Sequence, residues 1–382
     1  MIYFEKTDSS YTKAEFDEIA NQYSEQLRQA GYDRTCRLGV YGDYDNLFKI
    51  RGIMNVCSVV VIDSKASDYE KSHYDVDIWV DELPPPRFNQ CKDDEVVGYC
   101  SSGSTNKPRI ISWHKKGYEY ELEYSYKTQS GITKHDSTWN CLPLWAPLGQ
   151  QVFNSCYDID ATFYVLKEPY KNWPKYLPTF VVGSPNVLLR IVRDTEEPYE
   201  TMSIREIRAN SSPMYKDIKQ AIQTYFNCIT TDCYGMSEVG SISAMTYPQK
   251  FGSVGFVNEG RNVEIVEGEI VVDGFHTGDL GYIDDDGFLF ITGRIKDVIN
   301  KGGVKIMPYE VEKAIFACGA DDCVVFGYNT VNALVKGELN ETKLKTMIRD
   351  YKYPTNIIYV NNIPRRESGK ITRAKLIEEF LK

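Results

Sequence analysis

A loop rich in glycine and hydroxyl side chains is the first part of this chain that could bind an anion. Residues 101–109 read SSGSTNKPR. Closely spaced backbone N–H groups and hydroxyls bind phosphate well. The run is not a Walker A motif, because residues 106–108 read NKP where that motif needs Gly-Lys-Ser/Thr. Similar clusters also form ordinary loops, so the assignment depends on other motifs. The residues placed to contact an anion are Ser102, Gly103, Ser104 and Thr105.

Further motifs follow this loop, and their order along the chain is more informative than any one of them. They read YGMSE at 234–238, TGD at 277–279, GRIKDVINKGGVKI at 293–306 and PRRESGKITR at 364–373. Together with the loop, this set resembles the adenylate-forming superfamily of acyl-CoA synthetases, peptide-synthetase adenylation domains and luciferases. The resemblance runs from near Val96 to the end of the printed sequence. It indicates a compact stand-alone member.

The resemblance implies an ATP-dependent carboxylic-acid ligase, that is, an AMP-forming acid–thiol ligase of the acyl-CoA or acyl-carrier-protein synthetase type. A small carboxylic acid would first attack the α-phosphate of ATP, giving acyl-AMP and pyrophosphate. The acyl group would then pass to CoA or to the phosphopantetheine of a carrier protein. Because two anions must approach each other, the protein needs a phosphate cradle, a divalent metal and a mobile cation. The expected cofactors are ATP and Mg²⁺.

The same resemblance assigns the nucleotide to particular side chains. Tyr234 would stack on adenine, and Asp232 would accept a hydrogen bond from its amino group, since a carboxylate is an acceptor. The alternative for both is an ordinary strand end. Ser237 would contact the α-phosphate. The expected nucleotide-binding residues are Ser102, Gly103, Ser104, Thr105, Ser211, Ser212, Pro213, Asp232, Tyr234, Gly235, Ser237, Asp279 and Arg294.

Asp279 and Arg294 match the residues that contact ribose in the superfamily. A turn aspartate beside Gly278 is the alternative for Asp279. The position of Asp279 between hairpin strands and before the GRIKD run favours the ribose contact. Residues 210–213, which read NSSP, match the segment that lines the other face of adenine.

Lys370, Glu238 and Arg109 are the expected catalytic residues. Glu238 matches the Mg²⁺ ligand, since a hard divalent cation takes carboxylate and phosphate oxygens. Lys370 matches the catalytic lysine, whose flexible stem can bring one ammonium to both reacting anions. Arg109 stands where the superfamily usually has Lys, so a planar guanidinium with several N–H donors replaces a compact ammonium group. Asn106 stands where Gly is usual, and Asn tolerates positive φ.

The linker after Arg294 is expected to permit a domain rotation. Lys296 matches the hinge position, which must absorb a backbone change away from the chemistry. After acyl-AMP forms, the small domain would turn about Lys296 and remove Lys370. The resemblance then places a thiol channel at Gly302 and Gly303.

The acid pocket departs from the superfamily pattern. Residues 141–146 read CLPLWA, where acyl-CoA synthetases have an aromatic residue then His and amino-acid-activating domains have Asp. A buried substrate ammonium without a counter-charge is costly. This argues against an α-amino acid, unless Asp158 or Asp160 substitutes. An apolar or aryl acid fits Trp145 and Met236, for which core packing is the alternative. The pocket candidates are Trp145, Ala146, Gly149, Gly183 and Met236.

Two other functions remain open at this stage. One is the adenylation of an amino acid that is then loaded onto a carrier protein. The other belongs to a different class, a catalytically inactive nucleotide-binding protein. It is considered because Asn106 and Arg109 differ from the residues usual in the superfamily. Every polar role expected of the enzyme still has a residue to fill it, which favours the ligase.

Composition limits the partners. The chain has 382 residues, 42% of them hydrophobic, and a net charge of -10. The negative charge argues against a nucleic-acid or anionic-membrane surface. We expect no membrane span, because long apolar runs are missing, and no secretory signal at MIYFEKTDSS. The ten cysteines include no CxxC pair, and we expect them to be reduced and mostly buried in a cytoplasmic protein.

The pattern of apolar residues predicts an α/β fold. Thr12 and Glu15 form a capping box before a helix that Gly31 ends. Strands are expected near 38–41, 57–62, 180–183, 204–209 and 228–231, helices near 46–56 and 218–225, and hairpins at 263–272 and 282–291. We expect a large N-terminal adenylation domain at 1–295, with α/β sheets and a small β-rich lobe, and a small mobile α+β C-terminal domain at 296–382 carrying the catalytic lysine.

Overall fold

The chain folds into two compact units. The first contains Met1–Arg208, Phe226–Ile229 and Met236–Ser241, and the second contains Ala209–Tyr225, Thr230–Gly235 and Ile242–Lys382. The domain boundary expected between residues 295 and 296 stays a prediction. The computed structural model describes residues 1–92, 94–101, 108–123, 132–166, 177–194, 204–212, 214–245, 250–365 and 371–381.

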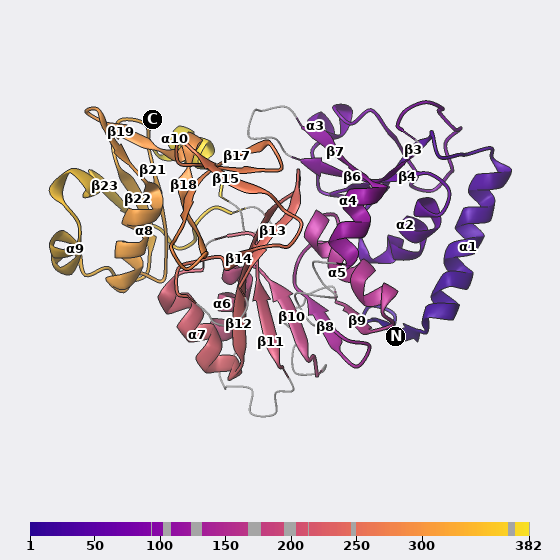
Figure 1. The fold of residues 1–382 in the computed structure, drawn as a ribbon, viewed down its shortest axis with the longest axis horizontal. Helices are drawn as coiled ribbons and strands as arrows, with labels where there is room; N and C mark the ends of the chain where they lie inside the picture. The colour runs from indigo at the N-terminus through magenta and orange to yellow at the C-terminus, as the bar shows by residue number, and fades with distance from the viewer. Residues whose placement is uncertain are drawn as a thin grey trace. The chain divides into compact units, whose positions relative to one another are not determined.

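A five-stranded sheet with the order β5-β3-β4-β6-β7 lies in the first unit. Its strands are β3 (Arg37–Tyr41), β4 (Ser58–Ile62), β5 (Asp77–Ile78), β6 (Glu95–Ser101) and β7 (Arg109–His114). All neighbours pair in parallel except β6 and β7 (Figure 1). β4 reads SVVVI and is buried along its whole length, as expected for a parallel strand covered on both faces.

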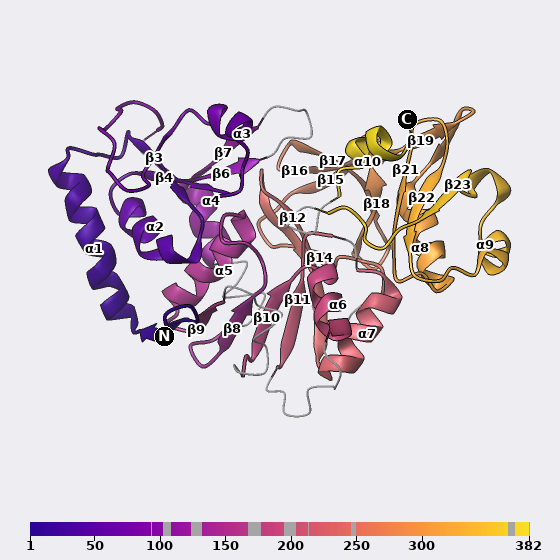
Figure 2. The same cartoon turned by 180° about the vertical axis from the view of Figure 1, so that it is seen from behind.

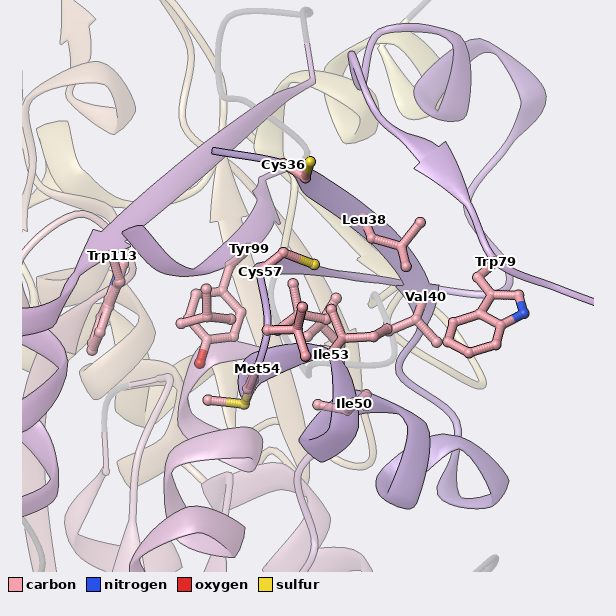
Figure 3. Close-up of a cluster of buried hydrophobic side chains, with 14 of the residues drawn as sticks. Cys36, Leu38, Val40, Ile50, Ile53, Met54, Cys57, Trp79, Tyr99 and Trp113 are labelled. Atoms are coloured by element: carbon pink, nitrogen blue, oxygen red, sulfur yellow. The ribbon is translucent and has the colours of Figure 1, made fainter. Parts of the chain in front are cut away.

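Helix α2 (Leu47–Met54) packs on this sheet through its apolar face. Figure 3 shows Ile50, Ile53 and Met54 pointing toward side chains of the sheet such as Leu38 and Tyr99. Helix α1 (Lys13–Gln29) begins at Thr12, whose hydroxyl accepts from the backbone of Glu15 while Glu15 accepts from Thr12 in return. The predicted capping box is therefore confirmed.

A second sheet of the first unit contains β2-β1-β9-β8-β10-β11 in that order. β1 pairs in parallel with β9, β9 with β8, and β8 with β10. The bounds are β1 (Ile2–Phe4), β2 (Ser9–Tyr11), β8 (Ser137–Asn140), β9 (Thr162–Val165), β10 (Phe180–Gly183) and β11 (Glu206–Ala209), with helices α3 (Asp68–Ser72), α4 (Lys115–Tyr120), α5 (Pro147–Asp158) and α6 (Pro185–Asp194).

The second unit contains strands from the middle of the chain and an antiparallel four-stranded sheet, β15-β16-β17-β18. The sheet consists of the two predicted hairpins, which pair through β16 and β17. The bounds are α7 (Lys216–Phe226), β12 (Ile229–Met236), β13 (Gly240–Ala244), β14 (Phe256–Val257), β15 (Val263–Val266), β16 (Glu269–Val272), β17 (Phe275–Ile283) and β18 (Leu289–Arg294).

The C-terminal part of this unit is a small α+β arrangement. Figure 2 shows α8 beside the three-stranded sheet β21-β22-β23, and the core there includes Phe326, Leu334 and Leu376. The bounds are β19 (Ile299–Lys301), β20 (Val304–Ile306), α8 (Pro308–Ala317), β21 (Asp322–Phe326), β22 (Asn332–Lys336), α9 (Glu341–Met347), β23 (Asn356–Tyr359) and α10 (Arg373–Phe380).

The predicted mixed α/β fold is confirmed by these parallel and antiparallel sheets. All ten cysteines are free thiols, and six of them are buried. Burial raises the pKa of several of these thiols, Cys100 to about 12 for example, which keeps them protonated and unreactive. Within the described residues, no helix is both long and apolar enough to cross a membrane.

Candidate active site

Part of the expected site lies outside the described residues. These residues are Ser102, Gly103, Ser104 and Thr105 of the phosphate loop, together with Pro213 and Lys370. Their assigned roles stay predictions. Among the remaining candidates, Arg109 and Glu238 form a pair in the first unit, and Tyr234, Asp279 and Arg294 form a cluster in the second unit.

In the first unit, Glu238 lies in the turn after β12 and faces the first residue of β7. Its Oε1 atom is 3.0 Å from Nη2 of Arg109. The Arg109 side chain is 62% exposed and that of Glu238 is 22% exposed, so the pair contributes little to stability. Both charged groups are therefore available to a charged ligand at small cost.

Two contacts fix the turn that carries Glu238. Trp113 of β7 donates its indole N–H to the carbonyl of Ser237 at 2.8 Å. The backbone N–H of Ser241 donates to Oε1 of Glu121, at 2.9 Å, and Glu121 is buried. Trp113 and Glu121 thus hold the turn on both sides of Glu238. Neither residue was predicted from the sequence, because each contact joins segments that lie more than 100 residues apart.

Of the pair Arg109 and Glu238, only Glu238 offers a carboxylate to Mg²⁺, so the ion would also need oxygens from the substrate phosphates. Within the described residues, no group of three or more His, Cys, Asp and Glu side chains could hold a metal ion. Mg²⁺ is commonly held by one or two carboxylates with phosphate and water completing its shell. Glu238, with the hydroxyl of Ser237 beside it in the chain, suits that mode of binding.

In the second unit, Asp279 of β17 is the centre of a polar cluster. Its Oδ2 accepts from the hydroxyl of Tyr234 at 2.7 Å, and its Oδ1 lies 2.7 Å from Nε of Arg294. Asp279 is 3% exposed. Burial, followed by the Asp279 charge, raises the pKa of Tyr234 well above its usual range, so its hydroxyl stays protonated and donates. The structure thus brings together the three residues expected at adenine and ribose.

The strand pairing explains this geometry. Asp279 and Arg294 are direct partners in the β17–β18 ladder. The part of β17 just before Asp279 is held by Glu269 of β16, whose Oε1 accepts from the N–H of Gly278 at 2.8 Å. The hydroxyl of Thr277 accepts from the N–H of Asp279. Asp279 is therefore positioned by its own sheet.

Asp232 makes a contact that the sequence did not predict. Its Oδ2 lies 2.9 Å from Nζ of Lys219 on α7, and both residues are buried. Burial raises the pKa of the Asp232 carboxyl, and the Lys219 ammonium opposes that shift. The atoms Asp232 Oδ1, Asn210 Nδ2 and Ser212 Oγ of this unit are buried and make no hydrogen bond with any described residue.

Other candidates of the second unit lie in turns, except Gly235, which lies near the end of β12. Ser211 has a φ of 78° and is exposed, as is Gly235. Lys296 lies in the short turn Ile295–Asp297 after β18 and is exposed. Gly302 and Gly303 connect β19 to β20 with φ of 61° and 87°. A two-residue hairpin turn with positive φ at both positions favours glycine, which explains this pair without reference to a channel.

The acid-pocket candidates lie in the first unit. Trp145 is partly buried and packs against the apolar cluster of the five-stranded sheet. Ala146 precedes α5, in which a Cβ atom on Gly149 would lie 2.1 Å from the Pro143 carbonyl oxygen. Gly149 is therefore required for close packing. Gly183 ends β10, and Met236 ends β12. Their roles toward an acid stay predictions.

Comparison with known proteins agrees with the motifs. A family model described as AMP-binding enzyme matches residues 45–281, which is more than half of the chain. The 4-coumarate–CoA ligase of Vanilla planifolia is 24% identical over 92% of this chain and 77% of its own length. The 4-coumarate–CoA ligase 1 of Arabidopsis thaliana is 29% identical, but over 50% of this chain and 45% of its own length.

Solved structures share the fold over almost the whole chain. ATP-bound MatB from Rhodopseudomonas palustris superposes with a TM-score of 0.86 at 17% identity, covering 99% of this chain and 95% of that one. O-succinylbenzoate coenzyme A synthetase from Bacillus subtilis, in complex with ATP and magnesium ion, gives a TM-score of 0.80 at 19% identity, covering 98% and 96%. At this identity the likeness shows the fold.

Proposed function

The chain belongs to the AMP-binding enzyme family, and from this premise we propose that it is an ATP-dependent carboxylic-acid ligase. It joins a carboxylate to the α-phosphate of ATP, releasing pyrophosphate, and then transfers the acyl group from acyl-AMP to a thiol. CoA ligases among its relatives favour CoA as that thiol over a carrier protein.

The cluster around Asp279 carries the proposal. A buried carboxylate that already binds Tyr234 and Arg294 still has lone pairs for the ribose hydroxyls, because an ionised carboxylate has about four acceptor sites. The unpaired atoms Asp232 Oδ1, Asn210 Nδ2 and Ser212 Oγ belong to the same unit and supply both acceptors and donors for a purine. Unpaired buried polar atoms are costly, and a polar ligand removes that cost.

Charged groups at the other cluster support phosphate chemistry. We assign Arg109 to the ATP phosphates and Glu238 to Mg²⁺ held jointly with them. When bound, Mg²⁺ neutralises phosphate charge and so lowers the barrier to attack by a second anion. We assign to Lys370 the ammonium that binds both the incoming carboxylate and the α-phosphate oxygen as they meet.

We further propose an apolar or aromatic acid as the substrate. Trp145 packs beside apolar side chains, and Ala146 adds no charge to that region. The relatives named after 4-coumarate act on an aromatic acid. We also propose that a domain boundary lies between residues 295 and 296 and that Lys296 is the hinge about which the small domain turns between the two half-reactions.

The test is pyrophosphate release from ATP and Mg²⁺ with a pooled library of carboxylic acids, with and without CoA. We expect release with an apolar or aryl acid, and a further rise when CoA is present. A strong response to amino acids that is indifferent to CoA would instead indicate amino-acid adenylation for a carrier protein. Nucleotide binding without release from any acid would indicate the inactive nucleotide-binding protein.

The lysine assignment has a direct test. Lys370→Ala should reduce acid-dependent pyrophosphate release by about 100-fold or more, in keeping with the loss of a charge aimed at the transition state. Lys375→Ala is the matched control, because Lys375 is an exposed lysine of the same segment of chain. Full activity in Lys370→Ala, with an unchanged circular dichroism spectrum, would overturn the assignment.

A further inference from the structure

Lys219 and Asp232 form an ion pair in which both charged side chains are buried, which is uncommon in proteins. Lys219 is 7% exposed and Asp232 is 8% exposed, and their charged atoms are 2.9 Å apart. Burying an ion pair costs desolvation that its attraction repays only partly, and apolar residues of similar volume often stabilise a protein more. Such a pair is therefore weak evidence for stability, and a role in ligand binding is the alternative to consider.

The two oxygens of Asp232 differ in their surroundings. Oδ2 accepts from Lys219, whereas Oδ1 is buried and makes no hydrogen bond with any described residue. Lys219 therefore fixes the orientation of the carboxylate and leaves one acceptor atom unsatisfied. An unsatisfied buried acceptor beside a proposed ligand site is best explained by a donor on the ligand.

The strand geometry places Asp232 next to Tyr234. Residues two apart on a strand point to the same face, with their side chains about 7 Å apart, which is close to the length of a purine. Tyr234 in turn binds Asp279, the proposed ribose ligand. The side chains of Asp232, Tyr234 and Asp279 therefore follow one another in the order acceptor, aromatic ring, carboxylate.

We propose that Lys219 is a positioning residue for nucleobase selection, holding Asp232 so that its free Oδ1 accepts from the 6-amino group of adenine. This inference rests on the proposed function, since it assumes that the second unit binds the adenosine part of ATP. A 6-oxo purine presents an acceptor to Oδ1 and is repelled, and a purine without a 6-substituent loses the bond. Lys219 also favours the ionised carboxylate, which can accept but not donate.

The test compares equilibrium binding of three nucleotides by calorimetry on the full chain, so that no knowledge of the acid is needed. The nucleotides are ATP, inosine triphosphate and the triphosphate of purine riboside, which is ATP without its 6-amino group. We expect the parent protein to bind ATP roughly 10- to 100-fold more tightly than the other two, the range for a hydrogen bond to a charged group.

Variants separate positioning from folding. Lys219→Met should reduce the preference for ATP over purine riboside triphosphate to nearly one, while affinity for purine riboside triphosphate is kept. Lys219→Arg keeps the cation and should keep the preference. Asp232→Asn should raise the affinity for inosine triphosphate relative to that for ATP, because an amide can donate to the 6-oxo group. Lys216→Met, an exposed lysine of the same helix, is the control.

The outcomes are distinct. If Lys219→Met folds and still prefers ATP over purine riboside triphosphate as the parent does, the proposed positioning role of Lys219 is wrong. A parent protein that binds all three nucleotides equally overturns the contact to Oδ1, while the proposed ligase function survives if pyrophosphate is released. A parent protein that binds none of them overturns both. If Lys219→Met fails to fold, Lys219→Gln takes its place with the same expected loss of the preference for ATP, and Asp232→Asn still tests the contact to Oδ1.

Discussion

Single residues already show why the cluster around Asp279 is the best-defined part of the proposed site. Asp279 is held by backbone contacts within its own sheet, and its oxygens bind Tyr234 and Arg294. A carboxylate fixed in this way needs no rearrangement to accept hydrogen bonds from two neighbouring hydroxyls. Preorganisation of this kind lowers the entropy cost of binding.

Asp279→Asn tests the ribose contact. We expect its affinity for ATP to fall roughly 10- to 100-fold, the range for hydrogen bonds to a charged group. Affinity for 2′,3′-dideoxy-ATP, which lacks both hydroxyls, should change little. Asp285→Asn is the control, because Asp285 is exposed in the β17–β18 turn. Equal losses for ATP and dideoxy-ATP, measured by calorimetry, would show that Asp279 acts on the fold and not on ribose.

Motifs predict residue types better than they predict partners. The run YGMSE pointed to Tyr234 and Glu238, and TGD pointed to Asp279. The residues that position Asp232 and the turn of Glu238 were not predicted, since Lys219, Trp113 and Glu121 act through contacts that exist only in the folded chain. The one sign in the sequence is that Lys219 borders the apolar face of its helix, where a charged side chain needs a buried partner.

Among the elements, two arginines anchor the chain on either side of residues 366–370. Arg365 binds Asp322 at the first residue of β21, with Nη2 and Oδ1 2.6 Å apart. Arg373 begins α10 and donates to Asp297 at 2.8 Å, to Glu312 at 2.7 Å and to the Val325 carbonyl at 2.9 Å. These contacts fix the described ends of the segment that contains the proposed catalytic lysine.

Arg373→Met should therefore impair the step that uses Lys370 more than the step that does not. We expect acyl-AMP formation to fall by roughly 100-fold, as when a reacting group is displaced by about 1 Å. Thioester formation from supplied acyl-AMP should stay close to that of the parent. Arg373→Lys should recover part of the loss, and Arg349→Met, at an exposed arginine, should have no effect. Equal losses in both half-reactions would indicate general destabilisation.

Helices and strands were predicted correctly where apolar residues recur at regular spacing, and were missed where an element is buried on all sides. The first helix was predicted from its capping box and its apolar face, and the hairpins from their turns. Helix α5 was not predicted, because it is buried on all sides and carries Gln150, Gln151 and Asn154 among its buried residues. A helix buried all round lacks the one-sided apolar stripe that reveals a surface helix. The strand β12 was placed only as far as Thr231, although it continues to Met236.

For the molecule as a whole, stability in acid depends on the carboxylates whose pKa is lowered on folding. Asp136 is the clearest case. It accepts from Arg205 at 2.8 Å, Thr179 at 2.7 Å and the N–H of Thr133 at 2.7 Å. Burial opposes its ionisation, but these hydrogen bonds outweigh burial and hold the pKa of Asp136 well below its usual range.

Asp136→Asn should lower the free energy of unfolding near neutral pH by about 2 kcal/mol, reduced from the value for a fully buried pair because Arg205 is partly exposed. A carboxyl whose pKa is depressed on folding stabilises the protein above its unfolded pKa of about 3.9 and loses that effect as pH falls further. The difference between parent and variant should therefore shrink below about pH 4. Urea unfolding followed by tryptophan fluorescence measures it. A constant difference from pH 7 to pH 3, or an equal loss in Asp81→Asn at an exposed site, would contradict this.

The proposed reaction has two half-reactions, and a rotation about Lys296 between them has a consequence that one substitution can test. Lys296 lies in a short helical turn, Ile295–Asp297. Proline fixes φ near the helical value, and a conformation that needs another φ then costs about 3 kcal/mol, or roughly 100-fold in rate. Lys296→Pro should therefore slow the two half-reactions unequally, sparing the one that uses the turn described here. Lys296→Ala leaves φ free and should affect both equally or not at all. If Lys296→Pro slows acyl-AMP formation and thioester formation by the same factor, no rotation at this residue separates them.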